Sequence, residues 1–134
     1  MNEKGYRQKI EKALVKEGFF VYTPNDQRTS GVPDVLACFD GGFFAIEVKT
    51  SKEQDAVAKL NHPLSAQQSY TLREIASSGG LAIVAIGSDN KLGIVKASAL
   101  TPGVSGALDV ETWLCMEEFA TWLKNTLEHS RRGI

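Results

Sequence analysis

Residues 31–50, GVPDVLACFDGGFFAIEVKT, decide how this chain of 134 residues is interpreted. Apolar, aromatic and β-branched residues predict strands over 34–39 and 43–49. The sequence DGG between them is typical of a tight turn that reverses the chain. The segment therefore predicts an antiparallel β-hairpin.

An acid and a base interrupt the second of these strands. Because side chains alternate along a strand, Glu47 and Lys49 share one face. Burying either charge alone is costly, so these two residues are expected to pair with an opposite charge or to serve a functional site. One interpretation is an ion pair on an edge strand, and the other is a functional site.

The hairpin register adds a second carboxylate, Asp34, to this pair. A two-residue turn pairs Phe39 with Gly42, and the same register places Asp34 opposite Glu47. Directly opposed residues share a face, with Cβ atoms about 4.5–5.5 Å apart. Carboxylates that close repel one another, and Mg²⁺ or Mn²⁺ between them would remove the repulsion. Alternatively, Asp34 is a turn aspartate after Pro33, and a three-residue turn would shift the register by one.

The rest of the chain predicts further helices and strands around this hairpin. Apolar residues at helical spacing, with glycines at the ends of the first two segments, indicate helices over 3–17, 64–78 and 116–128. Short apolar segments rich in β-branched or aromatic residues indicate strands over 19–23, 81–86 and 92–96. The segment 100–109 is expected to be a loop. The order αβββαββα indicates an α/β or α+β domain with a mixed central sheet flanked by helices.

The composition is that of an ordinary globular domain. Fifteen Lys and Arg against sixteen Asp and Glu leave a net charge of −1, and 43% of residues are hydrophobic. We expect a single domain over 1–134, with a core over about 3–96 and a C-terminal helical extension over about 97–134. Near-zero charge excludes a generic polyanion binder, so any polyanion contact must come from a local patch or a metal.

No apolar run is long enough for a membrane helix, and the charged N-terminus does not resemble a signal peptide. Cys38 and Cys115 are too few for a thiolate zinc site and no evidence of a disulfide framework, and Cys38 is expected to be a small core side chain. Phosphate-loop and nucleophile-elbow motifs are absent. These features predict a protein of a reducing cytoplasm with no membrane partner.

Two more polar residues, Gln68 and Glu3, lie on the helix faces that are expected to point into the protein. Ser65 and Gln68 have the S-x-x-Q form of a capping box, yet Gln68 also lies on the inward face of its helix. Both interpretations of Gln68 remain open. Glu3 shares the stripe of Tyr6, where it either reaches a charge or simply complements the helix dipole.

Taken together, these residues resemble a known nuclease signature. Pro33-Asp34 followed by Glu47-Val48-Lys49 resembles PD-(D/E)xK. A wider pattern resembles the VRR-NUC branch of that superfamily, which is similar to Holliday-junction resolvases: GVPD at 31–34, IEVK at 46–49, LSAQQ at 64–68 and the glycine pair at 79–80. The resemblance covers about residues 3–87.

The resemblance implies a restriction-endonuclease-like fold and a Mg²⁺- or Mn²⁺-dependent endonuclease acting on DNA, such as Holliday junctions or flaps, in a bacterial or phage-infected cell. Asp34 and Glu47 match the metal-binding carboxylates, and the main-chain carbonyl of Val48 matches a third ligand. Lys49 matches the lysine that orients or activates the attacking water. Gln68 and Glu3 match further site residues.

The sequence also predicts partners and leaves rivals open. Arg28, Lys52 and Lys59 are candidates for holding the DNA backbone, against ordinary solvation of surface charges. By analogy with the resolvases, a two-fold homodimer is expected, with the C-terminal helix as a possible contact surface. The rivals are a non-catalytic nucleic-acid or protein-binding module on the same fold, and a restriction-type nuclease.

Overall fold

The hairpin at the centre of the fold is built on the expected two-residue turn. Asp40 and Gly41 adopt φ angles of 49° and 78°, which suits the left-handed turn that matches strand twist. Phe39 pairs with Gly42, and the ladder continues to Val35 opposite Ile46. The predicted register is therefore confirmed.

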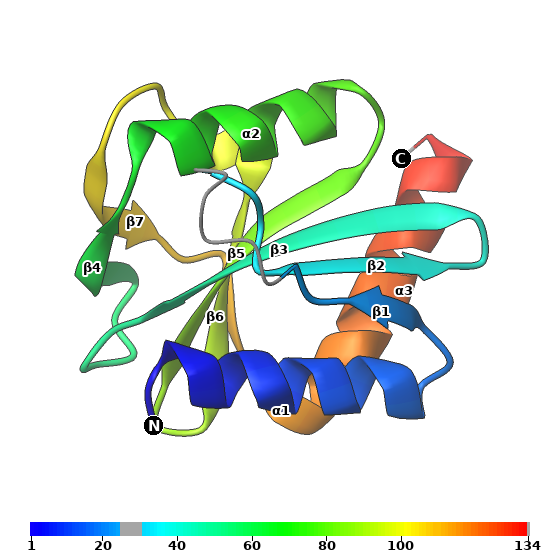
Figure 1. Cartoon of the computed structure of the whole chain (residues 1–134), viewed down its shortest axis with the longest axis horizontal. Coiled ribbons are helices and arrows are strands. Elements are labelled where there is room, and N and C mark those ends of the chain that lie inside the picture. The colour runs from blue at the N-terminus through cyan, green and yellow to red at the C-terminus, as the bar shows by residue number, and fades with distance from the viewer. Residues whose placement is uncertain (25–30, 134) are drawn as a thin grey trace.

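The computed structural model describes residues 1–24 and 31–133 (Figure 1). Its helices are α1 (Glu3–Lys16), α2 (Ala66–Ser77) and α3 (Met116–Arg132), with a short 3-10 helix, η1 (Ala97–Ala99). Its strands are β1 (Phe20–Tyr22), β2 (Val35–Phe39), β3 (Gly42–Thr50), β4 (Val57–Leu64), β5 (Leu81–Ser88), β6 (Lys91–Lys96), β7 (Ser105–Asp109) and β8 (Thr112–Cys115).

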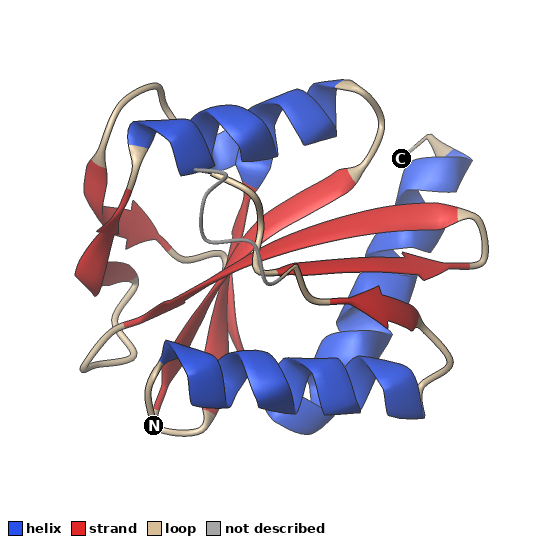
Figure 2. Cartoon of the chain, viewed as in Figure 1, coloured by secondary structure: helices blue, strands red, loops and turns tan. Residues whose placement is uncertain are grey.

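Six strands form the central sheet in the order β1-β2-β3-β5-β6-β8. β3 and β5 are parallel, because helix α2 lies in the crossover between them, and the other neighbours in the sheet are antiparallel. The mixed sheet flanked by helices matches the fold class that the sequence predicts (Figure 2).

Helices cover the sheet from both sides (Figure 1). Helices α1 and α3 pack on one face, where Ile10, Ile46 and Phe119 are fully buried. Helix α2 and the β4–β7 pair cover part of the other face, where Leu72 and Val84 are fully buried. Both faces of β3 are largely buried, including the face that carries Glu47 and Lys49.

Three strands were not expected from the sequence. β4 and β7 form a separate two-stranded sheet, and β8 joins the edge of the central sheet beside β6. The β4–β7 register shifts between Lys59 and Leu64, a stretch that contains Pro63, which cannot donate a ladder hydrogen bond. Because of this irregularity, β4 lacks the regular alternation of buried and exposed side chains that marks a strand in the sequence. The segment 100–109, which was expected to be a loop, contains strand β7.

The residues after 96 contact the sheet directly. Trp113 in β8 packs against the Gly93 backbone, and its indole donates to the Asp55 carbonyl at 3.0 Å. Phe119, on the inner face of α3, is fully buried. Within residues 1–24 and 31–133, the helices are too short or too polar to cross a membrane.

Candidate active site

Asp34 is held at the point where the β2–β3 ladder ends. Because β2 begins at Val35, the Val48 amide has no backbone partner on that side, and Asp34 Oδ2 accepts its hydrogen bond at 2.8 Å. The carboxylate thus replaces a carbonyl of the missing ladder residue. Continuing the register by one pair places Asp34 opposite Glu47.

Glu47 is a buried acid with one free oxygen. Its side chain is 3% exposed. Oε2 accepts a hydrogen bond from Gln68 Nε2 at 3.2 Å, whereas Oε1 has no hydrogen-bond partner in the described part of the chain. Burial, followed by the neighbouring negative charge of Asp34, raises the pKa of Glu47 to about 10.

Lys49 lies two residues further along the same strand face. It is also buried, at 5% exposure, and its positive charge lowers the pKa of Glu47, opposing the larger effects of burial and Asp34. Strand alternation keeps the ammonium on the side of the carboxylates. The site thus combines two carboxyl groups and the lysine ammonium, and all three lie on the β2–β3 hairpin.

Gln68 performs both roles that the sequence left open. Ser65 caps helix α2, accepting from the Gln68 amide at 3.0 Å, while Gln68 Oε1 accepts from the Ser65 amide at 2.9 Å. The side-chain nitrogen of Gln68, Nε2, donates a hydrogen bond to Glu47 Oε2. The capping box therefore orients Gln68 toward the carboxylate.

Glu3 approaches the site from the other side of the sheet. It lies in the first turn of α1, and its charge raises the pKa of Glu47. Glu3 Oε2 lies 3.7 Å from His62 Nδ1 on β4. Sequence reasoning did not select His62, because β4 is identified only by its pairing with β7.

The oxygen atoms at this site suit a hard divalent cation. Asp34 and Glu47 supply two carboxylates, and Glu47 Oε1 is buried without a hydrogen-bond partner among residues 1–24 and 31–133. No group of three His, Cys, Asp or Glu side chains suited to a metal occurs in that part of the chain. Mg²⁺ is commonly held by only one or two carboxylates and keeps several waters, so the donors present fit it.

The expected DNA-contacting lysines lie beside one cleft. Lys52 and Lys59 line a cavity of about 540 Å³ next to the end of β3, together with Glu53 and Asp55. The cleft therefore carries both signs of charge. Arg28 lies outside the described residues.

Comparison with known proteins identifies the fold. No protein-family model matches the chain, and no curated protein sequence matches it. Among solved structures, Hjc, a Holliday junction resolvase from Archaeoglobus fulgidus, superposes with a TM-score of 0.64 at 23% identity, over 87% of this chain and 98% of that one. The bacterial homing endonuclease I-Ssp6803I superposes with a TM-score of 0.54 at 12% identity, over 98% of this chain and 94% of that one. The chain has a restriction-endonuclease-like fold.

Proposed function

We propose that this protein is a Mg²⁺- or Mn²⁺-dependent endonuclease that hydrolyses phosphodiester bonds in branched DNA. The observation that carries the proposal is the juxtaposition, on one face of the β2–β3 hairpin, of the half-buried Asp34 with the buried Glu47 and Lys49. Its fold is shared with a Holliday junction resolvase and a homing endonuclease. Fold alone does not determine function, so the argument rests on the site.

Asp34 and Glu47 would hold the cation, with the main-chain carbonyl of Val48 as a third ligand. When bound, the cation supplies Lewis-acid stabilisation of the charge that develops on the phosphate. Glu47 Oε1, which has no hydrogen-bond partner among the described residues, supports this role as a candidate ligand atom.

Lys49 acts on the reacting groups by charge. Its buried ammonium favours an anionic nucleophile and the extra negative charge of the phosphate in the transition state. Gln68 holds Glu47 in place through the 3.2 Å hydrogen bond, and Glu3 adds negative charge on the far side of the site. Lys52 and Lys59 contact the DNA backbone.

Several finer assignments belong to the same proposal. Membership of the VRR-NUC branch is proposed from the motifs around Asp34, Glu47 and Gln68, which resemble those of that branch. A two-fold homodimer would supply the two active sites that concerted cutting of a junction needs. Both cysteines are free and exposed, which suits action in the cytoplasm of a bacterial or phage-infected cell.

The test is a cleavage assay over duplex, flap, fork and four-way junction DNA of matched sequence. We expect cutting with Mg²⁺ or Mn²⁺, none with a chelator, and preference for a branched substrate. Folded protein that binds these DNAs but cuts none of them would support a non-catalytic binding module instead. Sedimentation at working concentration tests the dimer, and a strict monomer that still cuts junctions in concert would contradict it.

A further inference from the structure

Exposed aromatic side chains gather at the β1–β2–β3 end of the central sheet. Phe20 and Tyr22 on edge strand β1 are 72% and 58% exposed, and Phe43 on β3 is 40% exposed. The register places Phe20 opposite Cys38, and Cys38 opposite Phe43, across three neighbouring strands. Directly opposed residues share a face. We call Phe20, Tyr22, Cys38 and Phe43 the aromatic strip.

The aromatic strip lies on the same sheet face as the catalytic group. Tyr22 pairs with Leu36, which is two residues from Asp34, and Phe43 precedes Glu47 by four residues on β3. At about 3.3 Å per strand residue, Phe43 lies about 13 Å from Glu47 along the strand. The strip therefore leads away from the site along one continuous surface.

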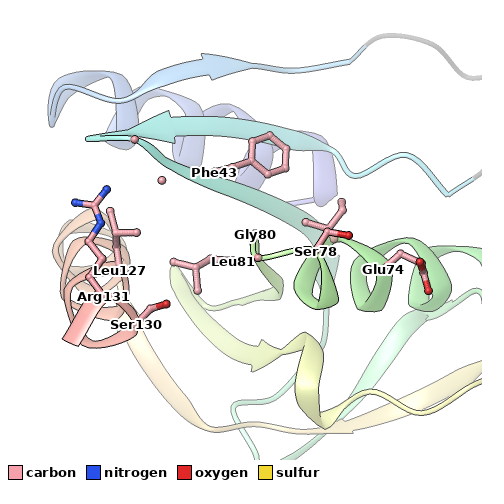
Figure 3. A pocket seen from close by; sticks show the side chains of 12 residues that line it. Phe43, Glu74, Ser78, Gly80, Leu81, Leu127, Ser130 and Arg131 are labelled. Atoms are coloured by element: carbon pink, nitrogen blue, oxygen red, sulfur yellow. The ribbon is translucent and has the colours of Figure 1, made fainter. Parts of the chain in front are cut away.

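A cavity of about 590 Å³ continues the aromatic strip beyond Phe43 (Figure 3). It lies between the last turns of α2 and α3, with Leu81 and Leu127 among its apolar lining. Arg131 borders it and donates a hydrogen bond to Asp40 Oδ2 at 2.8 Å. The surface that begins at the catalytic group thus ends in a hollow of mixed lining, where Glu74 and the Asp40-paired Arg131 lie beside apolar side chains.

The chemistry of the aromatic strip identifies its ligand. Three of its four exposed side chains are aromatic rings, and the fourth, Cys38, is uncharged. Flat rings on a rigid sheet stack nucleobases of any sequence. Bases within a duplex are already stacked and paired, whereas bases of a single strand are free to stack on protein rings. Continuity with the hydrolytic site favours nucleic acid over a protein partner.

We propose that the aromatic strip binds the unpaired bases of a single-stranded segment of the DNA substrate while the adjoining phosphodiester occupies the catalytic site. The inference rests on the proposed function and specifies its substrate: DNA with a single-stranded arm, such as a flap or fork. Tyr22, the residue of the aromatic strip closest to Asp34 in the strand register, makes the first stacking contact.

The native cysteines provide the test without any substitution. Cys38 lies inside the aromatic strip, and Cys115 on β8 is an exposed control. In protein without divalent cation, a short oligothymidine should slow maleimide labelling of Cys38 and leave Cys115 unchanged. A blunt duplex of equal length should protect Cys38 much less. Equal labelling of Cys38 with and without oligothymidine would overturn the inference.

Measuring the DNA affinity of substituted proteins provides a second test of the aromatic strip. Tyr22→Ala should weaken oligothymidine binding by about 5- to 150-fold, as expected for one lost stacked base, with little effect on blunt duplex binding. Val15→Ala is the matched control, because Val15 is 56% exposed on α1, on the opposite side of the sheet. An unchanged affinity in folded Tyr22→Ala protein would refute the stacking role.

Two outcomes separate this inference from its rivals. Cys38 protection that grows with protein concentration in the absence of DNA would show that a second copy of the chain covers the aromatic strip, and would overturn the inference. Cleavage of DNA without Cys38 protection would refute the strip and leave the nuclease standing, whereas protection without cleavage would support the strip and refute the nuclease.

Discussion

The two faces of strand β3 carry residues of opposite kinds. Toward α1 and α3, Phe44, Ile46 and Val48 are at most 1% exposed and entirely apolar. Toward α2, Glu47 and Lys49 are almost as deeply buried but ionisable. Burial stabilises the first set and opposes the charged forms of the second. One face therefore contributes stability, whereas the other buries ionisable groups whose charged forms burial disfavours.

The largest effect is expected at Asp34. Asp34→Ala removes a carboxylate of the proposed cation site and the acceptor for the Val48 amide. Metal affinity and cleavage should be lost together, by more than the factor expected for Lys49. Asp34→Asn keeps an acceptor for the amide and should restore stability but not cleavage. Calorimetric Mn²⁺ titration and single-turnover cleavage measure both, and active Asp34→Asn protein would contradict the site.

Lys49→Ala separates metal binding from chemistry. Because a protonated lysine cannot ligate a cation, Mn²⁺ binding should persist or strengthen. Cleavage should fall by a factor on the order of 10²–10³, the scale of one lost transition-state donor. Normal cleavage by the folded variant would mean that Lys49 is only an ion-pair partner.

The buried acid should make the metal-free protein less stable as pH rises. The folded-state pKa of Glu47, about 10, lies above its ordinary value of 4.5, so between these values the native state holds a proton that the unfolded state has lost. The contribution of Glu47 to the free energy of unfolding should therefore be fully present below pH 4.5 and be lost as the pH rises toward about 10, by at most about 1.4 kcal/mol per pH unit.

Glu47→Gln is the control for that pH dependence. It keeps the shape of the protonated acid and removes its titration. Urea melts across the pH range should give a flatter profile for Glu47→Gln than for the wild type. Identical profiles would show that Glu47 does not titrate as proposed.

The smallest effect is expected on the apolar face. Ile46→Val removes one buried methylene opposite the site and should cost about 0.5–1.5 kcal/mol of unfolding free energy. Cleavage per folded molecule and Mn²⁺ affinity should remain at wild-type values, because Ile46 faces α1 and α3. A large loss of cleavage at full folding would show that the two faces are not independent.

Local signals in the sequence determined the centre of this fold. The DGG turn sets the β2–β3 register, and strand alternation places Glu47 and Lys49 on one face. The S-x-x-Q capping box directs Gln68 inward. These features rest on contacts between residues close in sequence, where turn geometry and side-chain period leave few alternatives.

Tertiary structure alone decided the features that depend on distant partners. β4 and β7 form strands only because they pair with each other, and that pairing brings His62 to Glu3. Cys38, expected in the core, is exposed, because α2 covers only part of its sheet face and leaves the aromatic strip open. A side chain's alternation is local, but its burial depends on which helix packs above it, and no short stretch of sequence encodes that choice.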